Sequence, residues 1–506
     1  VIWLPLFAGC AARAKTPPQP TIADADQLAT IGCHTCLVDA LKIYDALLAG
    51  RPSAAVTRGA FRTALLLAIR EKELGLPATP YLGRARGLAP ALPAGERAQL
   101  ALDVATSLPW DQSGLSKEFG EEFVKTREAA APQVSAWHEQ LAPLRADPFF
   151  AYLDAALACV YGDWRARDRR LDEIASAQPS SLLVKYRIGA CVARRRVMLE
   201  EVLAAEPRFV EAHLVLGRYA LIEAATALGR RSIIEPHLDA AYKAFPKSPS
   251  VTFTMGGMYR AFNKMAAALR LYDETLALVP THREALLGRA IALTYLGRPA
   301  DAIATATRMI ELGQWYVGDA YYWRAFNLHE QKKLNEARDD IEQAKTRAGI
   351  RSDVFLLAGI IYFDRRELET AAADLGKAWQ LNDTTCDAAW YLGLVRAEQK
   401  QWDGAAARFP QAAGCYRSTA DILRAQLTEA LKGIEDENDR ATLDSDYSRT
   451  IEQQLVGEAR SYYNAAYACA QRGEREQALE YAQRAEQHPF MKTKAAELIA
   501  ALKKSP

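Results

Sequence analysis

The chain has almost no net charge and no long apolar run. Its 506 residues include 63 Lys plus Arg and 62 Asp plus Glu. This balance excludes a global electrostatic field that would recruit nucleic acid or anionic lipid. Beyond the N-terminus, no segment approaches the roughly 20 apolar residues that a membrane-spanning helix needs. The sequence therefore predicts neither a nucleic-acid-binding protein nor a transmembrane helix.

The chain also lacks a complete catalytic motif. His138-Glu139 begins a zinc-protease motif, but Ala142 stands where the second histidine is required. The segment from Cys33 to Cys36 reads Cys-His-Thr-Cys, without the following histidine that haem attachment needs and without a second cysteine pair for zinc. We expect no enzyme activity, no cofactor and no metal. Cys33 and Cys36 form a local disulfide or pack as small residues; a thiol enzyme using them is the alternative.

The N-terminus carries an apolar run, from Val1 to Gly9, that ends at Cys10. It is too short to span a bilayer and has the length of the hydrophobic part of a secretory signal. Leu6 to Cys10 resembles a bacterial lipoprotein box, although Phe7 occupies the place where the box usually has leucine. An ordinary signal is the alternative.

The lipoprotein resemblance implies where the chain is located in the cell. Residues 1–9 would be the remnant of a signal peptide whose true start is lost, and Cys10 would carry lipid, which anchors the protein to a membrane. Residues 10–25, with three prolines, would form an extended tether. Because Ala11 rather than Asp follows the cysteine, the resemblance implies the periplasmic side of the outer membrane.

Units of about 34 residues repeat along most of the chain. The first clear unit ends at Pro280, and the next four begin at Arg283, Gly318, Ser352 and Cys386 with one extra residue in the phase. Small residues recur where the two helices of a pair must approach closely. Aromatic residues recur where they would fill the space between one pair and the next, as the set Gly256, Tyr259, Ala268 and Tyr272 illustrates. This pattern resembles the tetratricopeptide repeat (TPR), and the whole chain resembles a bacterial TPR lipoprotein.

The resemblance implies an all-α fold, a right-handed superhelix of antiparallel helix pairs closed by a C-terminal capping helix. We expect a helical region of degenerate repeats over 26–147 and the TPR array over 148–419. A helical spacer over 420–458 and a terminal repeat with the capping helix over 459–504 would complete the chain.

TPR proteins are scaffolds that hold partner segments in the groove of the superhelix. In the family, the second, fifth, ninth, twelfth and thirteenth positions of each repeat line that groove. Here the fifth and ninth positions form an apolar and aromatic ladder: Phe253, Leu287, Ile291, Tyr322, Phe326, Leu356, Ile360, Trp390 and Leu394.

A partner for this groove is a protein that presents an amphipathic helix or an extended peptide. Some basic character in the partner would complement the acidic second positions, among them Asp319, Asp353 and Asp387. Two alternatives stay open for the groove: the superhelix closes on itself, or the N-terminal helices fill it. The alternative function is a lipoprotein that binds a glycan or peptide nutrient for an outer-membrane transporter.

The remaining cysteines would face an oxidising periplasm if the lipid anchor is correct. Cys386 opens the first helix of a repeat and Cys415 closes its second helix, so antiparallel packing brings them together. Cys159 and Cys191 occupy similar places in successive first helices and are a second candidate pair. Cys469 is expected to be a small buried residue.

Overall fold

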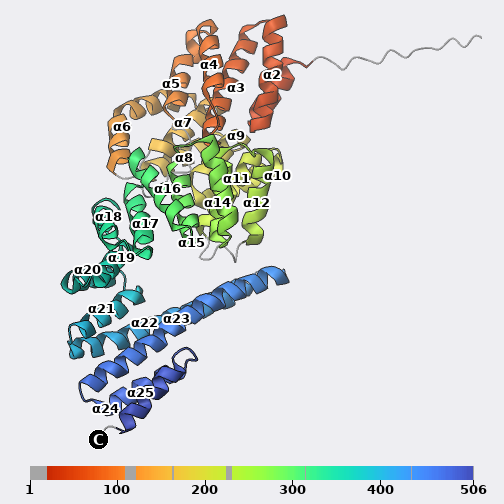
Figure 1. The fold of residues 1–506 in the computed structure, drawn as a ribbon. Helices are drawn as coiled ribbons and strands as arrows, with labels where there is room; N and C mark the ends of the chain where they lie inside the picture. The colour runs from red at the N-terminus through yellow and green to blue at the C-terminus, as the bar shows by residue number, and fades with distance from the viewer. Residues whose placement is uncertain are drawn as a thin grey trace, which may run out of the picture. The chain divides into compact units, whose positions relative to one another are not determined.

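The protein is described from a computed structural model. The structure describes residues 20–108, 121–161, 164–223, 231–313, 315–432, 434 and 436–504. Regular structure within these ranges is entirely helical, with 25 α-helices and four short 3₁₀ turns. Figure 1 shows the α-helices stacked as successive antiparallel pairs, which confirms the predicted all-α solenoid. Cys10 and most of the predicted tether lie outside the described residues.

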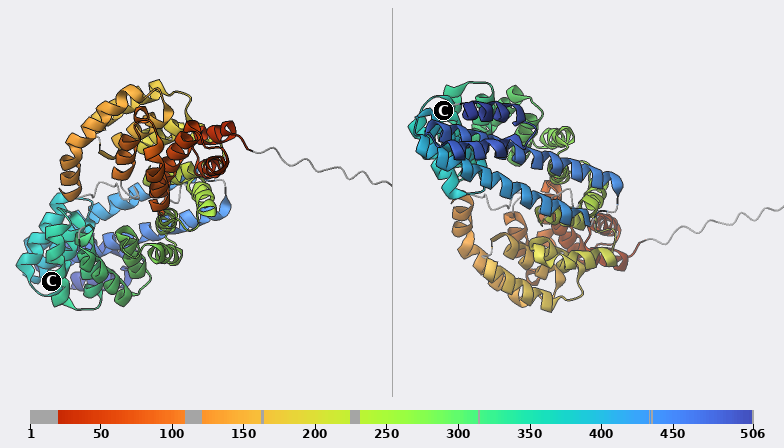
Figure 2. Two further views of the ribbon diagram at one scale, coloured as in Figure 1. Left: turned by 90° about the horizontal axis from the view of Figure 1, so that it is seen from above. Right: turned by 90° about the horizontal axis from the view of Figure 1, so that it is seen from below.

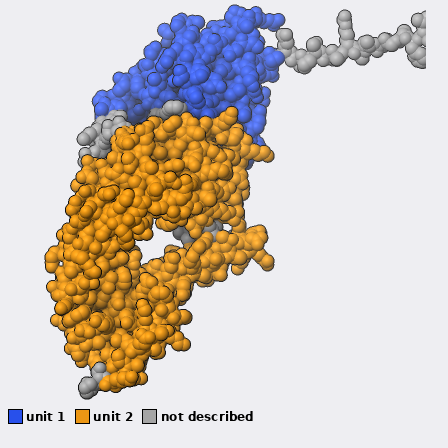
Figure 3. All heavy atoms as spheres, viewed as in Figure 1, with its two compact units in different colours: residues 1–110, 127–212 blue, residues 111–126, 213–506 orange. Residues whose placement is uncertain are grey.

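The chain divides into two compact units, coloured separately in Figure 3. Unit 1 comprises residues 1–110 and 127–212, and unit 2 comprises residues 111–126 and 213–506. The division at 212 falls inside the stretch that the repeat pattern treats as one array from 148 to 419. The helices before 148 pack with the first helices after it around a common core, so these repeats belong with the N-terminal region.

Unit 1 contains the N-terminal helices and the first degenerate repeats. Its α-helices are α1 (Ile22–Ile31), α2 (His34–Gly50), α3 (Ala54–Glu73), α4 (Thr79–Leu88), α5 (Ala98–Ser107), α6 (Glu121–Leu141), α7 (Pro148–Tyr161), α8 (Trp164–Ala177), α9 (Leu182–Cys191) and α10 (Val197–Ala205), with α6 and α11 (Val210–Glu223) crossing the unit boundaries.

Helices α3 and α7 form the centre of unit 1. Both are buried along nearly every face, including Phe61 and Leu65 on α3 and Tyr152 and Leu153 on α7. At the start of α7 the Asp147 carboxylate accepts a hydrogen bond from the backbone N–H of Phe149 at 2.9 Å, which satisfies a free donor of the first turn.

Unit 2 contains the regular repeats. Its α-helices are α12 (Arg231–Ala244), α13 (Pro249–Ala261), α14 (Met265–Leu278), α15 (Arg283–Tyr295), α16 (Pro299–Leu312), α17 (Val317–Glu330), α18 (Leu334–Arg347), α19 (Ser352–Asp364), α20 (Leu368–Leu381), α21 (Cys386–Glu398), α22 (Trp402–Lys432), α23 (Glu437–Gln471), α24 (Arg475–Glu486) and α25 (Lys492–Lys504). The first helices of the five repeats, α13, α15, α17, α19 and α21, begin 34 or 35 residues apart.

Small residues allow the helices of each pair to approach closely. A Cβ atom at Gly256 on α13 would lie 2.8 Å from the Tyr272 ring of α14, and one at Gly393 on α21 would lie 2.6 Å from the Phe409 ring of α22. Contacts under 3.0 Å are not tolerated without a shift, so the glycine and the aromatic residue of a repeat fit as a pair. This is the physical basis of the sequence pattern.

Most of the segment expected as a spacer belongs to two long helices that also form part of the flanking repeats. Helix α22 has 31 residues and α23 has 35, against 12 to 14 for the other helices of unit 2. The second helix of the fifth repeat therefore runs on into the segment 420–458, and the first helix of the last repeat starts inside it. Together α22 and α23 form a long antiparallel hairpin, seen in blue in Figure 2.

Candidate functional site

The predicted groove residues lie on the first helices of the repeats in unit 2. Each is partly buried and partly accessible to solvent: Phe253, Leu287, Ile291, Tyr322, Phe326, Leu356, Ile360, Trp390 and Leu394. The ladder therefore combines a packing role with an accessible apolar surface.

Further aromatic residues extend the ladder. The ring of Trp323 lies 5.3 Å from that of Tyr322, 5.8 Å from that of Phe326 and 6.4 Å from that of Tyr295 on the preceding first helix. Tyr295 is 66% exposed. Such ring contacts hold the aromatic side chains in fixed orientations. Tyr295 occupies the thirteenth position of its repeat, so the groove positions of the family identify it from the sequence, whereas Trp323 has no such signal.

A second aromatic group lies on α19 and α21. Tyr391 contacts Trp390 at 4.9 Å and Phe363 at 5.7 Å between ring centres, both edge to face. Phe363 occupies the twelfth position of its repeat, another groove position of the family. Aromatic residues thus lie on the first helices of the second to the fifth repeat, in two groups of ring contacts, one on α15 and α17 and one on α19 and α21.

The acidic second positions are partly neutralised within the protein. Arg351 binds Asp319 at 2.5 Å and Asp353 at 2.7 Å, so one guanidinium bridges two successive repeats. The Asp387 carboxylate accepts a hydrogen bond from the Tyr416 hydroxyl. Burial, together with the nearby Asp353, raises the pKa of Tyr322 to about 12, so this phenol stays neutral at physiological pH.

Charges at the other end of the first helices add to the acidic character. Glu330 is largely exposed, and Glu398 binds the exposed Arg366 at 3.0 Å. Asp364 accepts a hydrogen bond from the ring of His329 at 2.8 Å. Exposed pairs of this kind exchange readily with other partners, because each is worth only about 0–1 kcal/mol.

Three disulfides join the six cysteines singled out in the sequence. The structure pairs Cys33 with Cys36, Cys159 with Cys191, and Cys386 with Cys415. The Cα atoms of the last two pairs are each 5.5 Å apart, a normal separation for a disulfide. Cys469 is a free thiol and is buried, which raises its pKa.

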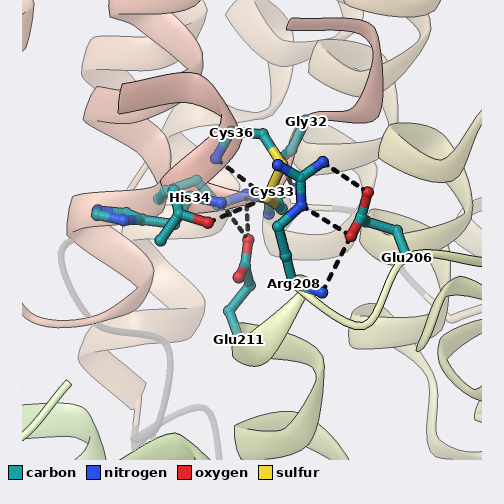
Figure 4. The surroundings of a disulfide bond; sticks show 9 residues. Gly32, Cys33, His34, Cys36, Glu206, Arg208 and Glu211 are labelled. Atoms are coloured by element: carbon teal, nitrogen blue, oxygen red, sulfur yellow. Dashed lines mark hydrogen bonds and ion pairs between the residues drawn. A yellow bond between two sulfur atoms is a disulfide. The ribbon is translucent and has the colours of Figure 1, made fainter. Parts of the chain in front are cut away.

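The Cys33–Cys36 disulfide lies at the start of α2, and Figure 4 shows its surroundings. Both cysteines are 0% exposed. The Glu211 carboxylate approaches the same helix end and accepts a hydrogen bond from the backbone N–H of His34 at 2.9 Å. Because exchange requires a thiolate to reach a sulfur atom, the buried pair favours a structural role over the thiol-enzyme alternative.

A cluster of buried charges lies beneath this helix end, within unit 1. Glu73 binds Arg70 at 2.8 Å and Arg187 at 2.7 Å, and the two arginines are 1% and 2% exposed. Arg70 also stacks on the ring of Tyr186 at 3.8 Å and lies 3.5 Å from Glu211. Two cations thus face two carboxylates, so the cluster is balanced in charge.

The cluster shifts the acidities of its two carboxyl groups in opposite directions. Burial alone would raise the pKa of Glu73, but the charges and hydrogen bonds of Arg70 and Arg187 lower it below its ordinary value. Burial dominates at Glu211 and raises its pKa. The strong pairing of Glu73 therefore makes it the anionic centre of the cluster.

The described residues contain neither a metal-binding cluster nor a membrane-spanning helix. Among them, no group of three or more His, Cys, Asp or Glu side chains is arranged to hold a metal ion. His213 and His237 form a hydrogen bond between their Nδ1 atoms at 2.7 Å, and burial lowers the pKa of His213. No helix in the described ranges is both long and apolar enough to cross a bilayer.

Comparison with known proteins gives structural likeness only. No family model matches the chain, and no curated protein matches it. Among solved structures, the APC/C hetero-tetramer Cut9–Hcn1 is 13% identical, with a TM-score of 0.46 over 94% of this chain and 96% of that chain. PilF of Pseudomonas aeruginosa is 16% identical, with a TM-score of 0.35 over 44% of this chain and 97% of that chain.

A third similar structure is YrrB, described as a TPR protein with an unusual peptide-binding site. It is 15% identical, with a TM-score of 0.30 over 35% of this chain and 91% of that chain. The likeness to these three structures concerns the fold alone. The pairing of its own helices, and the 34 or 35 residues between successive first helices, make the protein an α-solenoid with TPR-like repeats.

Proposed function

We propose that the protein is a lipid-anchored, periplasm-facing scaffold that binds a segment of a partner protein in the groove of unit 2 and performs no catalysis. The observation that carries this proposal is the half-exposed ladder of apolar and aromatic side chains along successive first helices. Accessible apolar side chains that recur at the same positions of successive repeats support an interaction site, because isolated exposed apolar residues need no such alignment.

The composition of the groove defines the partner. Side chains such as Tyr322, Phe326 and Trp390 offer flat apolar surfaces that suit the apolar face of an amphipathic helix or the alternate side chains of an extended peptide. Exposed carboxylates such as Glu330 favour Lys and Arg in that segment. We therefore propose a basic, amphipathic protein segment as the ligand.

Photo-crosslinking in intact cells tests this groove directly. A photoreactive phenylalanine analogue at the exposed Tyr295 is expected to cross-link a partner peptide that carries an excess of Lys and Arg. The same analogue at the exposed Leu278, on the second helix α14, is the matched control and should give little product. Mass spectrometry of the adduct identifies the peptide and its charge.

Truncating the aromatic side chains tests the mechanism of capture. Replacing Tyr322, Phe326 and Trp390 by Ala should reduce the yield of the Tyr295 cross-link at least tenfold. Truncating one aromatic residue at the centre of an interface can cost about 2 kcal/mol of binding free energy. Circular dichroism must show the helicity of the parent. Unfolding of the variant would assign the three residues to the core, and a cross-linked glycan or acidic peptide would contradict the proposed partner.

The lipid anchor has its own test, because the groove does not depend on it. In cells that produce the protein from its own gene, a palmitate analogue should label the wild type and Cys469→Ala but not Cys10→Ala. The thioether that holds the diacylglyceryl group requires the Cys10 sulfur, which explains the expected loss. Label retained in Cys10→Ala would refute lipidation at this residue, and would reopen the proposed compartment.

A further inference from the structure

The long hairpin of α22 and α23 reaches far beyond the repeats that flank it. A repeat helix here has 12 to 14 residues, whereas α22 continues to Lys432 and α23 begins at Glu437. The 16 residues of α22 from Arg417 to Lys432 alone add about 24 Å at 1.5 Å per residue. The repeat fold requires no such extension, so its length needs another explanation.

The extended part of the hairpin has its own apolar core. Side chains from both helices pack along its length: Ala420, Leu423, Leu427, Ala430, Leu431, Ile434, Leu443, Tyr447, Ile451 and Leu455. The Asp436 side chain caps α23, and Arg440 donates hydrogen bonds to the backbone carbonyls of Leu431 and Ile434 at 2.6 and 3.0 Å. The hairpin is therefore held together by its own apolar packing and hydrogen bonds.

The end of the hairpin contacts the opposite end of the repeat array, within unit 2. Asp439, in the first turn of α23, binds Arg231, in the first turn of α12, at 2.7 Å across 208 residues of sequence. Arg231 also binds Glu235 at 2.7 Å and lies 5.9 Å from the centre of the Phe262 ring. Helices α13 to α21, which carry the ladder, lie between these two points in the chain.

The result is a closed loop of structure in unit 2. The repeat array forms one side, and the hairpin runs from the fifth repeat back to α12 on the other. Figure 3 shows an opening through the atoms of unit 2 between the hairpin and the array. The views in Figure 2 likewise show the hairpin extending past the repeats that follow α12.

We propose that the hairpin is a clasp that closes the binding groove and must release α12 for a partner segment to enter or leave. This proposal rests on the proposed function of the groove, and it adds a control over access. The ion pair between Arg231 and Asp439 is weak, because the two side chains remain 25% and 26% exposed to solvent. A pair this exposed changes the ratio of closed to open molecules by roughly two- to fivefold, which suits a clasp that opens repeatedly.

Distance measurements on the free full chain test the clasp without any partner. Spin labels on keto amino acids at Ser232 and Asn438, both exposed, report the separation of α12 and the hairpin end and avoid the native cysteines. The wild type should show a population at short distance. Arg231→Glu should reduce that population about two- to fivefold or more, and raising the salt to about 1 M should act in the same direction.

Two variants make the result specific to this ion pair. The exchange Arg231→Asp with Asp439→Arg should restore the short distance, because it restores opposite charges. Arg449→Glu, which breaks the exposed pair with Asp446 elsewhere on the hairpin, should leave the distance unchanged. Absence of a short distance in the wild type, or a short distance indifferent to Arg231→Glu, would overturn the clasp.

The two proposals fail separately. If the groove binds no partner, the distance measurement still reports whether the hairpin closes. If the hairpin stays open in all variants, cross-linking at Tyr295 can still succeed, and the groove is then a permanently open site. A functioning clasp further requires that Arg231→Glu increase the rate of cross-linking at Tyr295, and an unchanged rate would refute the gating role.

Discussion

Replacing Glu73 by Gln is expected to destabilise unit 1 by about 3–5 kcal/mol, the cost of breaking a buried ion pair. Glu73 is the shared partner of Arg70 and Arg187, which are 1% and 2% exposed. Glutamine keeps the shape but removes the charge, so the buried guanidinium groups of Arg70 and Arg187 would lose the carboxylate that they share. Uncompensated buried charge is among the few causes of losses this large.

Hydrogen exchange and urea unfolding check this prediction. Exchange should accelerate in α3 and α9, which carry the cluster, and the unfolding transition of unit 1 should move to lower urea. Glu429→Gln is the matched control, because Glu429 forms an exposed pair with Lys432 and its loss should change stability by less than about 0.5 kcal/mol. Equal effects of the two substitutions would contradict a buried, charge-balanced cluster.

The same carboxylate gives unit 1 a defined pH dependence. The pKa of Glu73 is lowered in the folded state, so its contribution to stability is fully present above its unfolded pKa of about 4.3. That contribution is lost as the pH falls through the lower pKa that Glu73 has in the folded state. The acid sensitivity of unit 1 should therefore be smaller in Glu73→Gln than in the wild type below pH 4.

Replacing both Cys386 and Cys415 by Ala is expected to cost about 3–4 kcal/mol. The disulfide closes a loop of 29 residues in the unfolded chain, and the entropy of that closure sets the size of the effect. It also ties the start of α21 to the second helix of the same repeat, next to Trp390 of the groove. The loss should appear as a lower urea midpoint of unit 2.

Single substitutions provide the control for this pair. Cys415→Ala and Cys386→Ala should each lose about as much stability as the double variant, because either one removes the cross-link. Losses that add up independently would mean that the two side chains contribute by packing and that no bond joins them. Unit 1 should unfold at the wild-type midpoint in all three variants.

The regular repeats could be predicted from the sequence because their determinants are local. Gly256 and Tyr272 lie in the two helices of one pair. The contact of a glycine on the first helix with a bulky side chain on the second recurs from repeat to repeat. Cys386 and Cys415 were paired by the same reasoning, since antiparallel helices of one repeat bring their outer ends together. Such arguments need no knowledge of distant parts of the chain.

The charged cluster could not be predicted in this way. On a single helix, Arg70 and Glu73 are three residues apart and read as an exposed pair on a solvated face. Arg70 and Glu73 are buried because α9 and α11 pack against α3. These helices bring Arg187 and Glu211, which lie more than a hundred residues further along the chain, into contact with them. The sequence likewise predicts only a helical spacer over 420–458, because helical periodicity does not reveal where a helix end makes contact.

By itself the sequence determined the helix pairs, their period and the apolar face that each first helix presents, because these depend on residues within about 34 positions of one another. Only the tertiary structure decided which charges are buried, that the chain divides at residue 212, and that Asp439 meets Arg231. Those outcomes depend on how many helix pairs stack on one another, and the sequence of a single repeat does not determine the position of a distant one.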